Sequence, residues 1–163
     1  MTTPLLSTKL YIPPTRPELV TRPRLIDHMN AGLQGKLILV SAPAGYGKTT
    51  LVSDWIAQAK LPVAWLSLDR SDNDLPLFFR YFIAALQELH QDIGADIQVI
   101  LQADSHPPVE DLLTSLVNNL AALDARFILV LDDYHVITEF KIHEALDFLF
   151  GTGRLTGNRT AGD

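Results

Sequence analysis

The stretch SAPAGYGKTTL (residues 41–51) decides which fold this chain can form. It follows the phosphate-loop pattern of Gly, four residues, Gly-Lys and then Ser or Thr. In that pattern the glycines let the backbone turn its N–H groups toward phosphate oxygens, while Lys48 balances charge on the β and γ phosphates and Thr49 can ligate magnesium. Ala42 stands where the pattern opens with glycine. Because that position only leads from a strand into the loop, we expect alanine to be tolerated there.

The residues around the loop fit the same motif. The continuous apolar run at 36–41 predicts a buried strand, and the apolar residues after the loop recur at helical spacing. A strand before the loop and a helix after it form the context that the motif requires, although a glycine turn that merely ends in Lys-Thr is the alternative. We therefore expect a nucleotide to be bound by Ala44, Gly45, Tyr46, Gly47, Lys48, Thr49 and Thr50.

A second motif, FILVLDDYH (residues 127–135), places an acidic pair after another apolar run. A buried strand that delivers a carboxylate beside a phosphate loop can hold magnesium, which is the Walker B role, and we assign it to Asp132. Asp133 would orient or deprotonate the attacking water, so that Asp133 and Lys48 are the candidate catalytic residues. Alternatively, the two acidic residues simply begin a loop after a core strand. His135 is interpreted as a loop residue rather than as a metal ligand.

The remaining pattern alternates strands with helices. We expect a helix at 21–32 capped by Thr21, a strand at 62–68, a helix capped by Asp74, a helix after the Pro107-Pro108 pair and a helix around 142–149. This alternation predicts an α/β fold of the P-loop NTPase class, with a parallel sheet flanked by helices in three layers and incomplete at its C-terminal side.

Three segments are expected along the chain. Residues 1–20 hold four of the ten prolines and predict an extended arm. Residues 21–150 form the partial P-loop core. Residues 151–163 hold four of the nine glycines, and we expect this tail to be disordered because it has too little apolar surface to offset its ordering entropy.

Composition excludes several classes of protein. The formal net charge of -6 argues against direct binding of nucleic acid by this segment, because neutralising phosphates takes an excess of Lys and Arg. The absence of cysteine excludes a disulfide framework. Since neither a signal peptide nor an apolar run long enough for a membrane span occurs, we expect a cytoplasmic protein with no membrane partner.

Four stretches together carry a resemblance to a known family. They are LLSTKLYIPPTRPELVTRPRL (5–25), LVSAPAGYGKTTLVSDW (39–55), WLSLDRSDNDLPLFFRYFIAAL (65–86) and FILVLDDYHVI (127–137). The chain resembles, up to about residue 150, the N-terminal signal-transduction (STAND, P-loop) ATPases of MalT-like large LuxR-type transcriptional regulators. The phosphate loop alone is shared by many families, whereas the proline arm and the LDRSDND segment together are typical of this one.

The resemblance implies a regulatory module that binds ATP with Mg²⁺ and holds ADP in its resting state. In such proteins ATP and an inducer together drive oligomerisation, and ATP hydrolysis resets the inactive state, so self-association or pairing with full-length relatives is expected. It also implies that Val20 and Arg22 form part of the adenine pocket. After Phe150 the chain departs from the family, whose sensor arginine and DNA-binding domains would follow, and we therefore expect a truncated piece with weak ATPase activity at most.

Two other functions stay open from the sequence alone. A small P-loop phosphotransferase would use the same loop, although the glycine-rich lid that such enzymes close over the phosphate is not evident after the second strand. A non-catalytic remnant that acts only by association is the other alternative. The sequence identifies neither an inducer nor a target gene.

Overall fold

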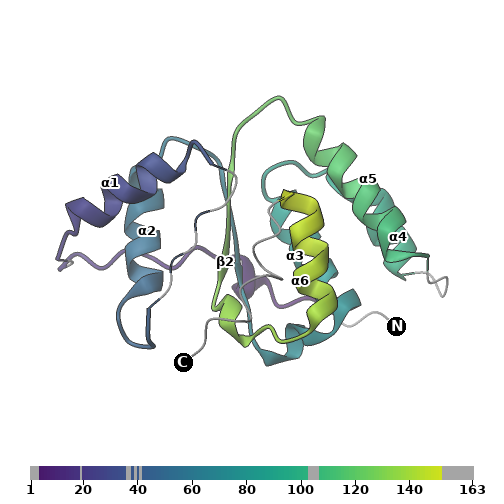
Figure 1. Ribbon diagram of the computed structural model, residues 1–163, viewed down its shortest axis with the longest axis horizontal. Coiled ribbons are helices and arrows are strands. Elements are labelled where there is room, and N and C mark those ends of the chain that lie inside the picture. The colour runs from purple at the N-terminus through teal and green to yellow at the C-terminus, as the bar shows by residue number, and fades with distance from the viewer. Residues whose placement is uncertain are drawn as a thin grey trace. The chain divides into compact units, whose positions relative to one another are not determined.

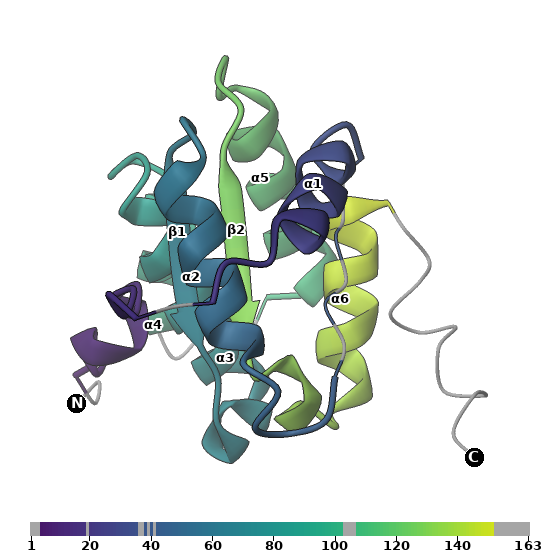
Figure 2. The same ribbon diagram turned by 90° about the vertical axis from the view of Figure 1, so that its left-hand side faces the viewer.

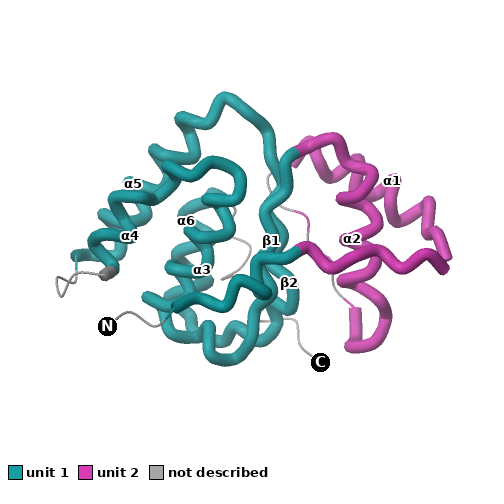
Figure 3. The backbone as a smooth tube through the Cα atoms, turned by 180° about the vertical axis from the view of Figure 1, so that it is seen from behind, with its two compact units in different colours: residues 1–11, 62–163 teal, residues 12–61 magenta. Residues whose placement is uncertain are grey.

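The computed structural model describes residues 4–18, 20–35, 38, 40, 42–102 and 107–151. These residues form six α-helices, three short 3-10 helices and two strands (Figure 1). The chain divides into two compact units, which Figure 3 shows in different colours: unit 1 (Met1–Tyr11 and Pro62–Asp163) and unit 2 (Ile12–Leu61). Most of the strand expected at 36–41, and all of the expected tail except Gly151, lie outside the described residues.

Unit 1 is built on two parallel strands, β1 (Val63–Ser67) and β2 (Ile128–Asp132), which run side by side in Figure 2. The register places Ser67 opposite Asp132, and the pairing continues beyond β1 because the Leu68 N–H donates to the Asp132 carbonyl at 3.0 Å. Parallel strands need a long crossover, and the helices between them supply it. The expectation of an α/β architecture with parallel strands is confirmed for this pair.

The crossover and the C-terminal part of unit 1 contribute four helices on one side of the sheet (Figure 1). They are α3 (Leu75–Gln87), α4 (Ala95–Gln102), α5 (Val109–Ala121) and α6 (Phe140–Phe150). Helix α3 packs against β1, and α4, α5 and α6 pack in turn against their helical neighbours. Sheet and helices give two of the three expected layers within unit 1.

Helix α3 forms the centre of the core. Its N-cap is Asp74, as expected, and the Asp74 carboxylate accepts the Leu77 N–H at 3.0 Å. The rings of Phe78 and Phe82 stack with centroids 5.8 Å apart, and both side chains are fully buried. Burying such a ring contributes about 1.5–3 kcal/mol relative to leaving it in water. The predicted apolar stripe of this helix is therefore the core of unit 1.

Three local features differ from expectation. Helix α4 was not predicted, and it follows Gly94, whose φ of 63° is left-handed. The proline arm is not wholly extended, because Ser7–Leu10 form a turn of 3-10 helix, η1. The cap predicted at Thr21 is wrong, since Arg22 is the N-cap of the first helix and no side chain caps it. The fixed φ of Pro23 at the helix start favours the helical conformation without such a cap.

Unit 2 pairs two helices, α1 (Pro23–Gly32) and α2 (Lys48–Gln58). Their buried side chains include Met29 of α1 and Trp55 of α2. The Trp55 Nε1–H donates to Asn30 Oδ1 at 2.9 Å, which satisfies the polar group of a buried indole. This contact joins the second half of α2 to α1.

The arm is attached to unit 1 through Lys9, a buried residue of η1. Its ammonium donates to both oxygens of Asp72, at 2.9 and 2.7 Å, and lies 2.7 Å from Asp69 Oδ2. It also lies 4.5 Å from the centroid of the Tyr81 ring, and the Tyr81 hydroxyl accepts the Leu6 N–H at 3.1 Å. Burial lowers the pKa of Lys9, but its bonds with the two carboxylates outweigh that effect and raise the pKa above its ordinary value.

Within the described residues, no helix combines the length and the apolar character that crossing a membrane requires.

Acidification is expected to destabilise unit 1 through Asp69. Hydrogen bonds from Lys9 and Ser71 lower the pKa of this carboxyl from 3.8 to about 2. Because the folded pKa lies below the unfolded one, the carboxylate stabilises the fold above about pH 4, and this contribution is lost as the pH falls toward about 2. Urea unfolding of Asp69→Asn should show lower stability than wild type at about pH 5 and a smaller loss on acidification. The same pH dependence in both proteins would contradict this prediction.

Replacing Gly94 by Ala is expected to lower the free energy of unfolding by about 1–3 kcal/mol. The left-handed φ disfavours any side chain, and an added Cβ would lie 2.8 Å from Cγ2 of the buried Ile83. Gly35→Ala is the matched control, since its Cβ would meet only the Gly32 carbonyl, at 3.4 Å, with no left-handed φ. Urea unfolding followed by circular dichroism measures the stability of both variants. Equal stability of the two variants would contradict the conclusion that position 94 requires glycine.

Candidate functional site

The phosphate loop of unit 2 adopts the backbone conformation that its glycines allow. Gly45 has φ 86° and Gly47 has φ 73°, both in the left-handed region. A Cβ added at either position would meet no atom within 4 Å, so the need for glycine is conformational rather than steric. The two residues turn the chain from the segment after Ala42 into the start of α2.

Helix α2 begins directly after the loop, with Gly47 as its N-cap. Its first intrahelical bond runs from the Leu51 N–H to the Gly47 carbonyl at 2.9 Å. The N–H groups of a helix's first turn lack partners within the helix, and the helix dipole adds partial positive charge at the same end. The stretch Lys48 to Thr50 therefore lies where a helix can bind a phosphate.

The side chain of Lys48 folds back over the loop. Its ammonium donates a hydrogen bond to the carbonyl of Ala42. The acceptor is a backbone group, which any residue at position 42 provides. The alanine that replaces the pattern's glycine is thus compatible with this contact.

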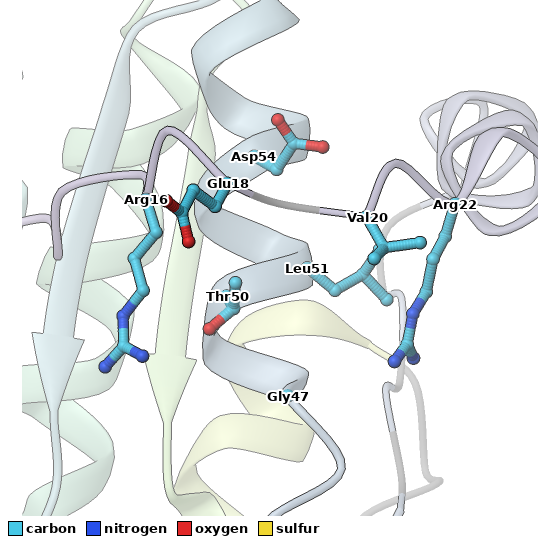
Figure 4. Close-up of a pocket in the computed structure, with 8 residues that line it drawn as sticks. All are labelled: Arg16, Glu18, Val20, Arg22, Gly47, Thr50, Leu51 and Asp54. Carbon is cyan, nitrogen blue, oxygen red and sulfur yellow. The ribbon is translucent and has the colours of Figure 1, made fainter.

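An open pocket of about 370 Å³ lies beside the start of α2, within unit 2 (Figure 4). Gly47, Thr50, Leu51 and Asp54 of α2 and its cap form one side, as Figure 4 shows. The other side is formed by Arg16, Glu18 and Val20 of the arm and by Arg22, the N-cap of α1. The lining combines two guanidinium groups, two carboxylates and the apolar side chains of Val20 and Leu51. Arg22 and Val20, which the family resemblance links to adenine, therefore share a pocket with the residues that end the phosphate loop.

The acidic pair lies in unit 1 at the carboxyl end of β2. Asp132 is the last residue of the strand, and its Oδ1 accepts the Asp133 N–H at 3.1 Å. Asp133 has φ 58° and ψ 31°, a left-handed conformation that costs a residue with a side chain about 1 kcal/mol. Asp132 is half-buried and Asp133 exposed, so the two carboxylates differ in solvent access.

The turn after the acidic pair, η3 (Tyr134–Val136), contacts helix α6 through a tyrosine and a histidine. The Tyr134 hydroxyl lies 2.5 Å from Nδ1 of His143, which is buried. Burial and then the negative charge of Asp147 raise the pKa of Tyr134, so the phenol stays protonated at neutral pH. His135 is exposed and lies 3.9 Å from Asp133 Oδ1, a loose contact of a loop residue.

The candidate metal ligands supply oxygen donors. Asp132 offers a carboxylate and Thr49 a hydroxyl, and both residues are half-buried. Within the part of the chain that the structure describes, no group of three or more His, Asp or Glu side chains could hold a metal ion. Protein sites for Mg²⁺ commonly use one or two carboxylates, with nucleotide phosphates and waters completing the shell. Taken by itself, each residue offers a donor of the type that such a metal uses, Asp132 in unit 1 and Thr49 in unit 2.

Sequence reasoning missed several residues near these positions. Arg16, Glu18 and Asp54 line the pocket, yet isolated charges in a proline-rich arm or on a helix give no signal of a site. Asn73 and His143 bind the turn after the acidic pair, and they stand 63 and 9 residues away from their partners in that turn. The LDRSDND segment was noticed as a marker of resemblance, but nothing in its pattern revealed what Asn73 contacts.

Comparison with known proteins places these features in context. The chain is 39% identical over 144 residues to the HTH-type transcriptional regulator MalT of Cronobacter sakazakii. It is 36% identical over 144 residues to proteins of the same name from Klebsiella pneumoniae subsp. pneumoniae and from Klebsiella pneumoniae strain 342. Each alignment covers 88% of this chain.

The chain spans only 16% of the length of these relatives, and it matches no family model. The matched region nevertheless takes in most of the chain at an identity well above what unrelated sequences show. The sequence is therefore MalT-like, and the chain is a homologue of one 144-residue segment of the transcriptional regulators that carry this name.

Proposed function

We propose that this chain is the P-loop nucleotide-binding module of a MalT-like transcriptional regulator and that it binds ATP with Mg²⁺. The observation that carries the proposal is the phosphate loop, in which two left-handed glycines lead into the start of a helix and a lysine. The relatives' name, HTH-type transcriptional regulator, supports the regulatory part of the proposal. The parallel pair of β1 and β2, with its crossover helices, is consistent with the P-loop NTPase fold.

The phosphate loop supplies the contacts to the triphosphate. The backbone N–H groups from Ala44 to Thr50 would bind the phosphate oxygens, and the Tyr46 N–H would exchange its 3.4 Å bond to the Pro43 carbonyl for this contact. Gly45 and Gly47 shape the turn. Lys48 exchanges its bond to the Ala42 carbonyl for the β and γ phosphates. An ammonium bonded to phosphate is a charge-assisted contact, which is about twice as strong as a neutral hydrogen bond.

The proposed roles of the acidic pair concern the metal ion and the attacking water. By the roles that the two motifs predict, Thr49 and Asp132 would each supply an oxygen to Mg²⁺, which would neutralise charge on the phosphates. Asp133 would orient a water for attack on the γ phosphorus and accept its proton, while the new oxygen–phosphorus bond forms and the bond from the γ phosphorus to the oxygen of the leaving ADP breaks.

Hydrolysis is proposed to be slow, with ADP bound in the resting state. Asp133 is exposed in the described structure, and catalysis of phosphoryl transfer depends on closely positioned charges and an ordered water. Slow hydrolysis suits a molecular switch, because the protein then stays in its ATP-bound form until the nucleotide is hydrolysed to ADP. Self-association of the ATP-bound form, or pairing with full-length relatives, is the proposed output.

The base of the nucleotide is proposed to enter the pocket beside α2. Val20 and Leu51 offer apolar surface to a planar ring, and the guanidinium of Arg22 can stack on it. Thr50 and Gly47 line the same pocket, so the base side and the phosphate side of the site share the first turn of α2.

Lys48→Ala is expected to weaken ATP binding in the presence of Mg²⁺ by at least about tenfold, because a charge-assisted contact to the phosphates is lost. Lys60→Ala is the matched control, since Lys60 is an exposed lysine near the end of the same unit. Isothermal titration calorimetry of the folded chain measures both. Equal affinity of Lys48→Ala and wild type, or no ATP binding by folded wild type, would refute the proposed function.

Arg22→Ala is expected to weaken ATP binding by about tenfold while leaving the affinity for inorganic triphosphate unchanged, because the arginine contacts the base. Arg24→Ala is the control, since Arg24 is exposed and is not among the residues that line the pocket. Competition titrations with both ligands measure the two affinities. A parallel loss for ATP and triphosphate would instead place Arg22 at the phosphates.

A further inference from the structure

The acidic turn, residues 133–139, is held in place by a side chain from a distant loop. Asn73 belongs to η2 (Arg70–Asn73), the 3-10 turn that follows β1 in the LDRSDND segment. Its Nδ2 donates to the Val136 carbonyl at 2.9 Å, and its Oδ1 accepts the N–H groups of Thr138 and Glu139 at 2.7 and 2.9 Å. One amide thus binds three backbone groups of the acidic turn.

These contacts fix both ends of the acidic turn. The Val136 N–H donates to the Asp133 carbonyl at 3.0 Å, so holding Val136 constrains the backbone of Asp133. Glu139 is the N-cap of α6, and its carboxylate accepts the Lys141 N–H at 3.1 Å. Asn73 therefore also sets where α6 begins.

Asp133 needs such support because its own conformation is unfavourable. Its left-handed φ of 58° persists only where the surroundings enforce it. The contact of Tyr134 with His143 holds the turn from the side of α6, and Asn73 holds it from the side of η2. Without either support the backbone would be free to relax toward ordinary φ values and carry the carboxylate with it.

The loop that bears Asn73 is held in turn by the arm. Asp72 is completely buried, and its carboxylate binds the Lys9 ammonium and accepts the Asp69 N–H at 2.8 Å. Lys9 comes from η1, at the start of the chain. A continuous series of contacts therefore runs from Lys9 through Asp72 and Asn73 to the turn that carries Asp133.

We propose that Asn73 is a positioning residue for Asp133 and that docking of the arm through Lys9 keeps Asn73 in place. The inference rests on the proposed function for the role of Asp133 at a Mg²⁺-nucleotide. Detachment of the arm would then lower the order of the acidic turn, although the contacts of Lys9 described above are with Asp69, Asp72 and Tyr81 and not with that turn. The arm thereby influences the position of Asp133 through η2, which carries Asn73.

The first test is hydrogen–deuterium exchange of the full chain followed by peptide. Asn73→Ala should speed exchange at residues 133–139 by about tenfold or more and leave α3 and α5 unchanged, since three hydrogen bonds to backbone groups of this turn are lost. Asn118→Ala, at an exposed position of α5, is the control. Unchanged exchange in the turn, or equal acceleration throughout unit 1, would overturn the inference.

The second test examines the arm. Lys9→Met leaves Asp72 buried and unpaired, so the double variant Lys9→Met with Asp72→Asn removes the ion pair without leaving a buried charge. It should also speed exchange at residues 133–139. Asp72→Asn alone keeps an oxygen that can accept the Asp69 N–H. Its exchange shows how much of the change in the double variant comes from position 72 alone. Normal exchange in the acidic turn of the double variant would overturn the coupling to the arm.

The third test separates this inference from the proposed function. ATP affinity is measured by calorimetry with Mg²⁺ and with EDTA in wild type and in Asn73→Ala. Because the Asp133 N–H donates to Oδ1 of Asp132, the proposed metal ligand, at 3.1 Å, a displaced Asp133 would also release that carboxylate. The variant should therefore lose about tenfold or more of the Mg²⁺-dependent gain in affinity and keep its affinity in EDTA. Asn73→Asp, which retains an acceptor for the Thr138 and Glu139 N–H groups, should recover part of that gain. An intact gain in Asn73→Ala would refute positioning of the acid, whereas failure of wild type to bind ATP would refute the proposed function and leave exchange to decide the structural role of Asn73.

Discussion

A carboxylate with no exposure to solvent has to find a cation and hydrogen-bond donors, and Asp72 imposes this requirement on unit 1. Lys9 meets it with two hydrogen bonds, and the Asp69 N–H provides a third. Removing one partner of such a buried pair typically costs about 3–5 kcal/mol, because the other charge is left uncompensated. The arm is consequently bound to the loop after β1, and the position of that loop decides which groups Asn73 can reach.

The same loop explains why the LDRSDND segment is so polar directly after a buried strand. Its polar residues bind several parts of unit 1, and both Asp69 and Asp72 contact Lys9 of the arm. Asp69 caps η2, Asp72 binds the arm, Asn73 binds the acidic turn and Asp74 caps α3. The segment that most clearly marks the resemblance to MalT-like regulators is therefore organised around internal contacts. In the proposed function its contribution to the nucleotide is indirect.

The sequence allowed much of the fold to be predicted, because the elements concerned are defined by local patterns. Strands β1 and β2 and the buried face of α3 follow from apolar runs and helical spacing, and the Asp74 cap follows from its place before Leu75 and Pro76. Helix α4 was missed because it is short and begins after a left-handed glycine rather than a capping residue. The left-handed conformation of Gly45 and Gly47 could be expected from the phosphate-loop motif. The left-handed φ of Asp133 could not be expected from the sequence, since it depends on surroundings that only the folded chain provides.

The candidate site shows the same division between local and long-range information. The phosphate loop is contiguous, so its residues and their proposed roles could be assigned from the motif. The supports of the acidic turn come from Asn73, more than 60 residues earlier in the chain, and from His143 on the next helix. No periodicity links such positions, and an asparagine in a polar loop is expected to face solvent. Three backbone groups of the acidic turn depend on the Asn73 side chain, so the conformation of Asp133 depends on Asn73 as well. The candidate site therefore includes Asn73 in addition to Asp133.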